Sequence, residues 1–287
     1  MKVALVHISA GVDATPASPV IDHLGMEMLS GALASAGYSP VQFDSLLQGL
    51  SATMLVEAIL KEEPGIVACS MNYANWSQSL QLLKEIKAAD SSVFCVAGGY
   101  YATFHWDSIL LNECCDCCII GEGERPLVQL CDAVSKRLPL DGIAGAALRR
   151  DGRPACNSPA RTDLNCWSLR ADRQLLPLLE RFPDGSRKIA LERSRGCYHN
   201  CAFCSIAAQQ GLSGQAARRR VRDADDLVDE MRILQSRSSI RDYWFMDATF
   251  LGPAGGKHQD LELAKKLTQI NDGYMNLEID TRADTIN

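Results

Sequence analysis

The sequence predicts an α/β protein in two parts. Short apolar, β-branched runs alternate with segments of helical period along the N-terminal half, and a second β-α-β-α-β series begins at residue 188. Strands that alternate with helices form parallel sheets whose faces are covered by the helices. We therefore expect an open parallel sheet in the N-terminal half and a partial (β/α) barrel in the C-terminal part.

The elements of the N-terminal half follow from hydrophobic periodicity and from helix stop signals. Strands are expected at residues 2–9, 41–46, 65–70, 92–97 and 117–120. Helices are expected at residues 22–36, 53–63, 76–89, 106–112 and 127–136. Gly37 is expected to end the first helix and Thr53 to cap the second.

The rest of the chain begins with a predicted hairpin, in which Asp151-Gly152 forms the turn, and an irregular connection. Strands are then expected at residues 188–192, 243–247 and 276–280, and helices at residues 223–236 and 259–270. We expect a first domain over residues 1–140, a hairpin and linker over 141–186, and the first half of a barrel over 187–287.

The composition is that of an ordinary globular protein rather than of a nucleic-acid-binding or membrane protein. The 287 residues are 47% hydrophobic and 22% charged, and their net charge of −6 provides no general attraction for nucleic acid. No apolar run is long enough to span a bilayer, and the start of the chain lacks a signal-peptide pattern. Twelve cysteines without an export signal indicate reduced thiols, so we expect a cytoplasmic protein.

Three cysteines, Cys197, Cys201 and Cys204, lie in one short segment at C-x3-C-x2-C spacing. Thiolates are preferred ligands of iron–sulfur clusters, and three of them leave one iron of a 4Fe–4S cluster open for chemistry. The alternatives are a zinc loop, for which no second ligand pair follows downstream, and a disulfide framework, which does not suit a long intracellular chain.

The segment from Arg195 to Cys204, read as Arg-Gly-Cys-x3-Cys-x2-Cys with aromatic Phe203 before the last cysteine, resembles the radical S-adenosylmethionine enzymes. The resemblance implies that the open iron chelates the amino and carboxylate groups of S-adenosylmethionine. It also implies that the reduced cluster cleaves this molecule to a 5′-deoxyadenosyl radical and that Phe203 lies beside the adenine. An external electron donor of the flavodoxin or ferredoxin type would supply the electron.

Three further segments follow predicted strands at one edge of the N-terminal sheet, where open α/β sheets bind their ligands. Their residues are Ser70, Met71 and Asn72; Gly98, Gly99, Tyr100, Tyr101, Ala102 and Thr103; and Gly121, Glu122, Gly123 and Glu124. The glycines let the backbone approach a bulky ligand closely. The alternative for Glu122 and Glu124 is a solvated turn.

These segments resemble the cobalamin-binding domain of one radical S-adenosylmethionine subfamily, which implies a flavodoxin-like, Rossmann-type fold for the first domain. The family pattern Gly-Gly-Pro-His-Ala-Thr has Tyr100 and Tyr101 in place of proline and histidine here. The Asp-x-His-x-x-Gly motif that supplies a histidine to cobalt is absent, and Asp22-His23-Leu24-Gly25 does not match it. The resemblance therefore implies base-off cobalamin without a histidine ligand, its nucleotide tail threaded into the sheet.

Two polar residues, Asp247 and Arg282, follow strands of the C-terminal part. Their side chains could pair with the amino-acid group and sugar of S-adenosylmethionine, and the resemblance supports both positions. The structural alternative for each is an ion pair at the end of a strand.

Three other groups of residues are expected to have structural rather than functional roles. The cysteines at 114, 115, 117 and 118 are expected to be buried hydrophobic residues rather than a metal site. The basic run from Arg218 to Arg222 is expected to be a solvated segment before a helix. His7 and His105 are expected to be hydrogen-bonded structural histidines.

The barrel is expected to have only three of the roughly six β/α units usual in the family. We expect either a fragment of a longer protein or a second chain that completes the barrel, and the isolated chain would then be inactive. An open third strand would expose unpaired edge groups.

The predicted function is that of a cobalamin-dependent radical S-adenosylmethionine enzyme, with methyl transfer to an unactivated carbon as the leading reaction. A small molecule or natural product would be the substrate, and no catalytic acid or base is assigned. The alternatives are a methylthiotransferase, and a cofactor-binding sensor or relic without activity.

Overall fold

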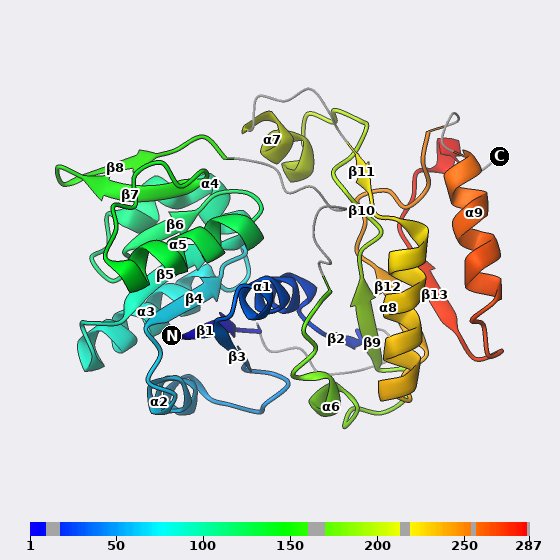
Figure 1. The fold of residues 1–287 in the computed structure, drawn as a ribbon, viewed down its shortest axis with the longest axis horizontal. Helices are drawn as coiled ribbons and strands as arrows, with labels where there is room; N and C mark the ends of the chain where they lie inside the picture. The colour runs from blue at the N-terminus through cyan, green and yellow to red at the C-terminus, as the bar shows by residue number, and fades with distance from the viewer. Residues whose placement is uncertain (10–17, 160–169, 213–218, 254–256, 286–287) are drawn as a thin grey trace. The chain divides into compact units, whose positions relative to one another are not determined.

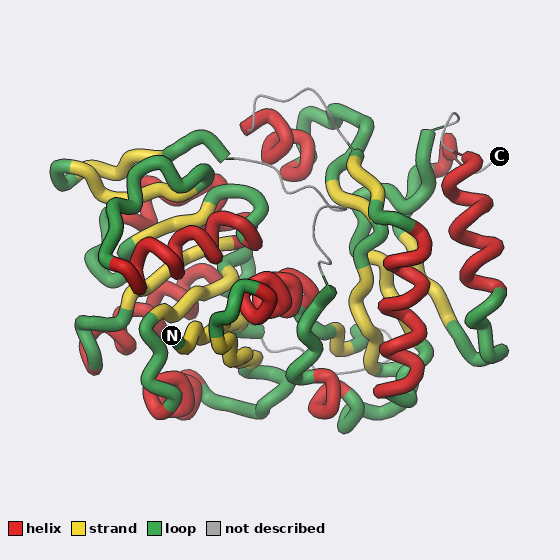
Figure 2. Tube along the Cα trace, in the orientation of Figure 1, coloured by secondary structure: helices red, strands yellow, loops and turns green. Residues whose placement is uncertain are grey.

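The computed structural model describes residues 1–9, 18–159, 170–212, 219–253 and 257–285, and the chain is a mixed α/β protein (Figures 1 and 2). Contacts divide it into two compact units. Unit 1 comprises Met1–Gly11, Gly25–Thr162 and Ala171–Leu175, and unit 2 comprises Val12–Leu24, Asp163–Arg170 and Leu176–Asn287. The domain boundaries at residues 140 and 186 stay a prediction.

Unit 1 is built on a seven-stranded sheet of order β3-β1-β4-β5-β6-β7-β8. Its strands are β1 (Lys2–His7), β3 (Ser39–Asp44), β4 (Ile66–Ser70), β5 (Phe94–Gly98), β6 (Cys117–Ile119), β7 (Ala146–Arg150) and β8 (Arg153–Cys156). The first five in this order are parallel, whereas the β7–β8 hairpin adds to β6 in antiparallel fashion. The predicted hairpin therefore extends this sheet.

Helices cover both faces of the sheet in unit 1. They are α1 (Leu24–Ser35), α2 (Ala52–Lys61), α3 (Trp76–Ala89), α4 (Gly99–Leu110) and α5 (Glu124–Lys136). Alternate strand residues, such as Ala4, Val6 and Val67, share one core with α2, α3 and α4. The intervening Val3 and Leu5 are equally buried on the opposite face, where α1 and α5 cross in front of the strands (Figure 1). This double burial explains why the strands are apolar throughout.

Unit 2 contains a parallel four-stranded sheet of order β13-β12-β9-β2. Its strands are β2 (Val20–Ile21), β9 (Arg187–Leu191), β12 (Asp242–Phe245) and β13 (Asn276–Ile279). The helices α8 (Ala224–Arg237) and α9 (Lys257–Thr268) connect the last three strands and pack against each other. Shorter elements are α6 (Leu176–Leu179), β10 (Ser194–Arg195), α7 (Ser205–Leu212), β11 (Arg220–Val221) and η2 (Ala283–Thr285).

The predicted fold class is confirmed, and several local predictions are corrected. The cap of α2 is Ser51, whose hydroxyl accepts from the Met54 N–H at 3.3 Å, and not Thr53. Helix α4 begins at Gly99 rather than near residue 106, so most of the expected 98–103 loop is helical. Strand β2 was not predicted, because two residues carry no periodic signal and only the pairing with β9 defines them.

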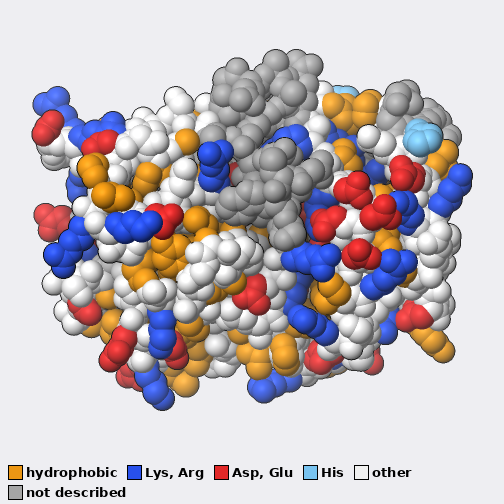
Figure 3. Space-filling model, viewed as in Figure 1, with side chains coloured by type: hydrophobic (Ala, Val, Ile, Leu, Met, Phe, Trp, Pro, Cys, Tyr) orange, Lys and Arg blue, Asp and Glu red, His pale blue; other side chains and the backbone are white. Residues whose placement is uncertain are grey.

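Charges of both signs are interspersed on the face seen in Figure 3, which agrees with the expectation of no broad basic surface. Within the described ranges, the helices are all too short or too polar to cross a membrane.

Candidate functional site

The parallel strands of unit 1 bring the three predicted segments to one edge of the sheet. His7 in β1 is in register with Ser70 in β4, and Ser70 is in register with Gly98 in β5. The carboxyl ends of these strands therefore lie side by side, which is where open α/β sheets bind ligands.

The segment after β4 is held by asparagine side chains. The Asn72 N–H donates to Asn75 Oδ1 at 2.8 Å, and Asn72 Oδ1 accepts from the N–H groups of Ala74 and Asn75. Asn75 is buried and donates through Nδ2 to the carbonyls of Ile8 and Ser70. Met71 is fully buried, so its side chain packs in the core and is not exposed to solvent.

The segment after β5 approaches this loop through its glycines. Gly99 has φ of +90°, and a Cβ there would lie 2.7 Å from the carbonyl oxygen of Met71. Only glycine fits both the left-handed backbone and this close approach. The N–H of Tyr101 donates to the same carbonyl at 3.0 Å.

Thr103 joins the second and third segments. Its hydroxyl donates to the Gly99 carbonyl at 2.9 Å and accepts from the Gly121 N–H at 3.0 Å. Glu124 begins α5 and is only 4% exposed, so the alternative of a solvated turn is wrong for this residue. The segments at residues 98–103 and 121–124 are therefore hydrogen-bonded to each other at the edge of the sheet, and we call them the ledge.

Four aromatic rings stand beside this ledge and were not all predicted. Tyr101 stacks on Trp76 with ring centroids 4.9 Å apart and on His105 at 4.4 Å, while Tyr73 meets Tyr101 edge-on at 5.3 Å. Tyr73 Oη and His105 Nε2 are 3.3 Å apart. Tyr73 and Trp76 keep exposed ring area, so the cluster provides a flat apolar surface for a planar ligand.

The other histidine of this edge also has a hydrogen-bonded role. His7 Nδ1 lies 2.8 Å from Asp44 Oδ2, and the other carboxylate oxygen of Asp44 accepts from the N–H groups of Leu46 and Leu47. Both His7 and His105 are thus hydrogen-bonded within the chain, as expected.

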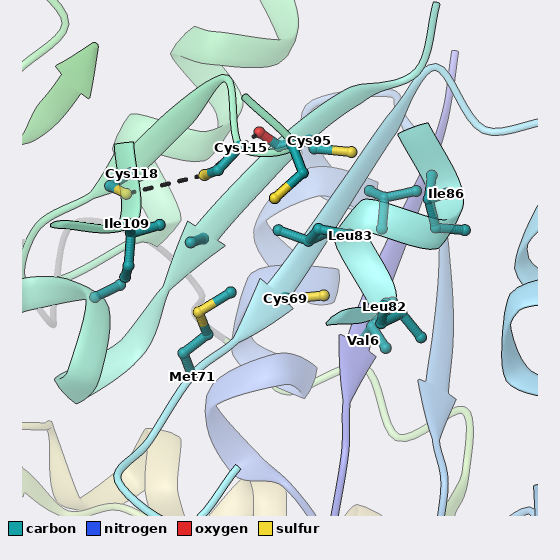
Figure 4. Close-up of a cluster of buried hydrophobic side chains, with 14 of the residues drawn as sticks. Val6, Cys69, Met71, Leu82, Leu83, Ile86, Cys95, Ile109, Cys115 and Cys118 are labelled. Carbon is teal, nitrogen blue, oxygen red and sulfur yellow. Dashed lines mark hydrogen bonds between the residues drawn. The ribbon is translucent and has the colours of Figure 1, made fainter. Parts of the chain in front are cut away.

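The cysteine-rich segment around β6 lies in the core (Figure 4). Cys114, Cys115, Cys117 and Cys118 are all buried, and the sulfurs of Cys115 and Cys118 are 4.0 Å apart. Burial raises the pKa of the Cys117 thiol well above its usual range and raises the pKa of Cys95 to about 12. Their burial in the core agrees with the interpretation as small hydrophobic residues.

The three-cysteine loop of unit 2 follows β9 and the short strand β10. Gly196 takes φ of +82° immediately before Cys197. The Cys197 sulfur accepts from the His199 N–H at 3.4 Å, and the Cys204 N–H donates to the Cys201 carbonyl at 3.0 Å. Helix α7 starts right after Cys204, and the amide of Gln210 lies against the Cys197 peptide with polar contacts of 2.6 and 3.2 Å.

This loop carries the three thiols that a cluster would need. Among the described residues, no three His, Cys, Asp or Glu side chains converge on a point that could hold a metal ion. A cubane cluster takes each thiolate on a different iron, so the sulfurs need not converge. Two buried polar atoms of the loop, Tyr198 Oη and His199 Nε2, have no hydrogen-bond partner, which agrees with a site that awaits a ligand. Phe203 is 92% exposed and free to stack on a planar group.

The two polar residues at the strand ends of unit 2 make intramolecular contacts. Asp247 is 3% exposed and accepts from the Arg193 N–H at 3.0 Å and from the Ser194 hydroxyl. Arg282 donates to both carboxylate oxygens of Asp284 at 2.9 and 3.1 Å, which is the ion pair that we weighed as its alternative.

The basic run was predicted incorrectly. Arg222 is 5% exposed and donates to Glu230 at 2.7 Å and to Asp226 at 2.6 Å, and Arg219 reaches the Phe250 carbonyl. Arg222 is therefore interior to unit 2, and Arg219 is half-buried, so the expectation of a solvated segment is wrong for Arg222. Arg218 lies outside the described residues.

Sequence reasoning missed Tyr73, Asn75 and Trp76 at the first edge and Ser194 at the second. The signal for the first three was present, because two asparagines and two aromatic residues, each pair spaced by three positions, follow the predicted strand. Ser194 carries no such signal, since its importance comes from a contact with a residue 53 positions away.

Comparison with known proteins finds a matching family model and several similar proteins. Residues 12–131 match the family model of the B12 binding domain. An uncharacterized methyltransferase of Pyrococcus horikoshii is 30% identical over 210 residues, which are 72% of this chain and 44% of that protein. The hopanoid C-3 methylase of Methylococcus capsulatus is 29% identical over 223 residues, 74% of this chain and 40% of that protein. The chain thus spans less than half the length of these curated relatives.

Two solved structures share the fold over nearly the whole chain. The cobalamin-dependent S-adenosylmethionine radical enzyme OxsB, solved with aqua-cobalamin and S-adenosylmethionine, superposes with a TM-score of 0.83 at 18% identity over 99% of this chain and 39% of that chain. The radical S-adenosylmethionine methyltransferase TsrM of Kitasatospora setae, solved with cobalamin and a 4Fe–4S cluster, gives a TM-score of 0.73 at 18% identity over 97% and 54% of the two chains.

The B12-binding match, the three-cysteine loop and the shared fold agree with one another. The chain therefore carries a match to the B12 binding domain over residues 12–131 and shares the fold of OxsB and TsrM.

Proposed function

We propose that this chain belongs to an enzyme that uses cobalamin, a 4Fe–4S cluster and S-adenosylmethionine to transfer a methyl group to an unactivated carbon. The observation that carries the proposal is the combination, on one chain, of a B12-binding sheet edge with a C-x3-C-x2-C loop after the first full strand of a β/α unit. Curated relatives named as a methyltransferase and a methylase support methyl transfer.

Cobalamin would lie on the edge of unit 1 formed by residues 70–72, 98–103 and 121–124. The close contact of Gly99 with Met71 and the bridge made by Thr103 hold these segments close together. A large ring bound at this edge would therefore contact backbone atoms. The aromatic cluster of Tyr73, Trp76, Tyr101 and His105 provides apolar area beside it. Bound cobalamin would supply a transferable methyl group, while the protein aligns it.

The cluster would be held by Cys197, Cys201 and Cys204, with one iron left for S-adenosylmethionine. Phe203 is placed on the exposed side of the loop, where it would stack on the adenine. Because the Arg282 guanidinium is paired with Asp284, it would have to bind the cofactor and Asp284 at the same time. A small organic substrate is in keeping with TsrM, which was solved with tryptophan, and an external flavodoxin or ferredoxin would supply electrons.

The proposal is tested by anaerobic reconstitution of the full chain with iron, sulfide and hydroxocobalamin. We expect both bound cobalt and about four irons per chain by elemental analysis. Cys201→Ala is expected to lose the cluster and keep cobalamin. The matched control Cys156→Ala, which removes a partly buried cysteine of β8, is expected to keep both. A wild-type chain whose spectrum ignores hydroxocobalamin would contradict the cobalamin half.

Formation of 5′-deoxyadenosine or S-adenosylhomocysteine under reducing conditions would separate an enzyme from a cofactor-binding sensor. A methylthiotransferase would need further cluster ligands in its N-terminal part. Cys69 and Cys95 are buried within β4 and β5, so nothing favours this alternative.

A further inference from the structure

We propose that Asp247 is a positioning residue that holds the stem of the three-cysteine loop, rather than a direct ligand of S-adenosylmethionine. The stem is defined here as Arg193 and Ser194, two of the four residues between the end of β9 and the turn at Gly196. The inference rests on the proposed function, since the loop is assigned to a cluster there.

The first observation is that both carboxylate oxygens of Asp247 are committed to the stem. Oδ2 accepts from the Arg193 N–H at 3.0 Å, and Oδ1 accepts from the Ser194 hydroxyl. Asp247 and both stem residues are each at most 3% exposed. A carboxylate that is 3% exposed and accepts a hydrogen bond on each oxygen presents almost no surface to a bound cofactor.

The second observation is that the stem is held from its other side as well. Arg219 Nε donates to the Ser194 hydroxyl oxygen at 3.0 Å and to the Thr249 carbonyl at 3.1 Å. Ser194 therefore lies between the carboxylate and a guanidinium, and Arg219 also ties it to the segment that follows β12. Antiparallel pairing of β10 with β11 adds backbone bonds to the same short stretch.

The side chain of Arg193 completes the arrangement. It donates to the Phe250 carbonyl at 2.9 Å and to Asp260 in α9 at 2.6 Å, and its guanidinium lies 4.8 Å from the centre of the Phe250 ring. Both Arg193 and Ser194 are thus hydrogen-bonded to the segment that starts at Asp247. The cost of breaking one such buried contact is the desolvation of the group left unpaired.

Two opposing influences act on the Asp247 carboxyl group. Burial raises the pKa of Asp247, and the hydrogen bonds from Ser194 and Arg193 and the nearby Arg219 charge act against that rise. An anion enclosed by two donors and a guanidinium is a structural anchor of the kind that orients metal-binding loops from behind. Cys197 is three residues beyond Ser194, so a loosened stem would displace the first thiolate.

The test uses the full chain reconstituted anaerobically and compares Asp247→Asn with the wild type. Asparagine has nearly the same shape but cannot accept from both the amide and the hydroxyl through two oxygens. We expect the cluster of Asp247→Asn to be lost to a chelator roughly 10-fold faster than that of the wild type. We also expect an altered electron paramagnetic resonance spectrum of the reduced cluster in the absence of S-adenosylmethionine.

The matched control is Asp242→Asn at the start of strand β12, which ends two residues before Asp247, and it should leave both measurements unchanged. Circular dichroism checks that each variant folds. Ser194→Ala removes the hydroxyl from the same contact without touching Asp247, and we expect it to accelerate cluster loss as well. In the double variant the two effects should be far from additive, because both break one contact.

A different pattern would overturn the inference. If Asp247→Asn and Ser194→Ala keep the wild-type spectrum and chelator resistance, and Asp247→Asn only weakens S-adenosylmethionine binding, then Asp247 binds the cofactor directly. Should Asp247→Asn fail to fold, wild-type chelator resistance in Ser194→Ala alone would overturn the inference. A wild-type chain that assembles no cluster is a separate outcome, which would contradict the proposed function.

Discussion

At the scale of single residues, the edge of unit 1 depends on one glycine more than on any polar side chain. Gly99 combines a left-handed backbone with the approach to the Met71 carbonyl. Through this contact and the bridge made by Thr103, three segments from separate strands are held together. The geometry of a backbone, rather than a set of charged groups, therefore shapes the candidate cobalamin surface.

Gly99→Ala is expected to lower the free energy of unfolding by about 2–3 kcal/mol, because alanine is strained at positive φ and its Cβ would collide with backbone. Gly142→Ala is the control, since Gly142 has φ of +89° with nothing within 4 Å of its Cβ position. It should cost only about 1 kcal/mol. Urea denaturation followed by circular dichroism measures both, and equal losses would show that the close approach is unimportant.

A pH dependence is expected from Glu180 in unit 2. Hydrogen bonds from the Ser238 hydroxyl at 2.7 Å and the Ser239 N–H at 2.8 Å lower the pKa of this carboxyl below its usual value. A lowered pKa contributes stability that is present above the unfolded-state pKa and is lost as pH falls through the folded-state pKa.

Glu180→Gln should therefore lose less stability than the wild type when the pH is lowered from about 6 to about 3, by up to about 1 kcal/mol. Denaturation curves at several pH values measure the difference. Identical slopes for the two proteins would show that these hydrogen bonds do not favour the ionised form.

At the scale of elements, the segment from β11 into α8 shows how one charge pattern can be solvated or buried. The run of arginines was predicted to be exposed because charged runs usually are. In the structure Arg222 contacts Asp226 and Glu230 on α8 and donates to the Glu192 carbonyl at 3.1 Å. Its partner Glu230 is 6% exposed and Asp226 is half-buried, so the charge of Arg222 is balanced below the surface.

Arg222→Met is expected to destabilise the protein by about 3–5 kcal/mol, because it leaves buried carboxylate and carbonyl groups without their cationic partner. The control Arg232→Met breaks the exposed pair with Asp229 on the same helix and should cost under about 1 kcal/mol. Thermal and urea unfolding compare the two variants. A small loss in Arg222→Met would contradict the buried network.

At the scale of the whole molecule, each unit has its own parallel sheet and its own candidate site. Hydrogen exchange with mass spectrometry can therefore follow each cofactor by itself. Hydroxocobalamin should slow exchange in residues 98–103 and 121–124, whereas cluster assembly should slow it in residues 196–205. Binding stabilises the bound state by mass action, about 2.7 kcal/mol at a hundredfold excess over Kd. Protection of residues 196–205 by cobalamin alone would contradict this assignment.

Much of the architecture could be predicted because it is written in local patterns. Helix α3 was predicted with its observed ends, and the strands of both sheets within a few residues. The start of α4 was missed because Gly-Gly reads as a turn, although Gly98 here is the cap of a helix. Strand β2 was missed because pairing with a distant partner, and not its own two residues, makes it a strand.

The sequence alone determined the order of strands and helices, the three thiolates of one loop and the glycine segments at the strand ends. These features depend on spacing and periodicity, which act over a few neighbouring residues. Only the tertiary structure decided that Asp247 meets Ser194, that Arg222 is interior and that Tyr101 stacks on Trp76. Each of these depends on residues far apart in the chain, whose meeting is set by packing and desolvation rather than by local pattern.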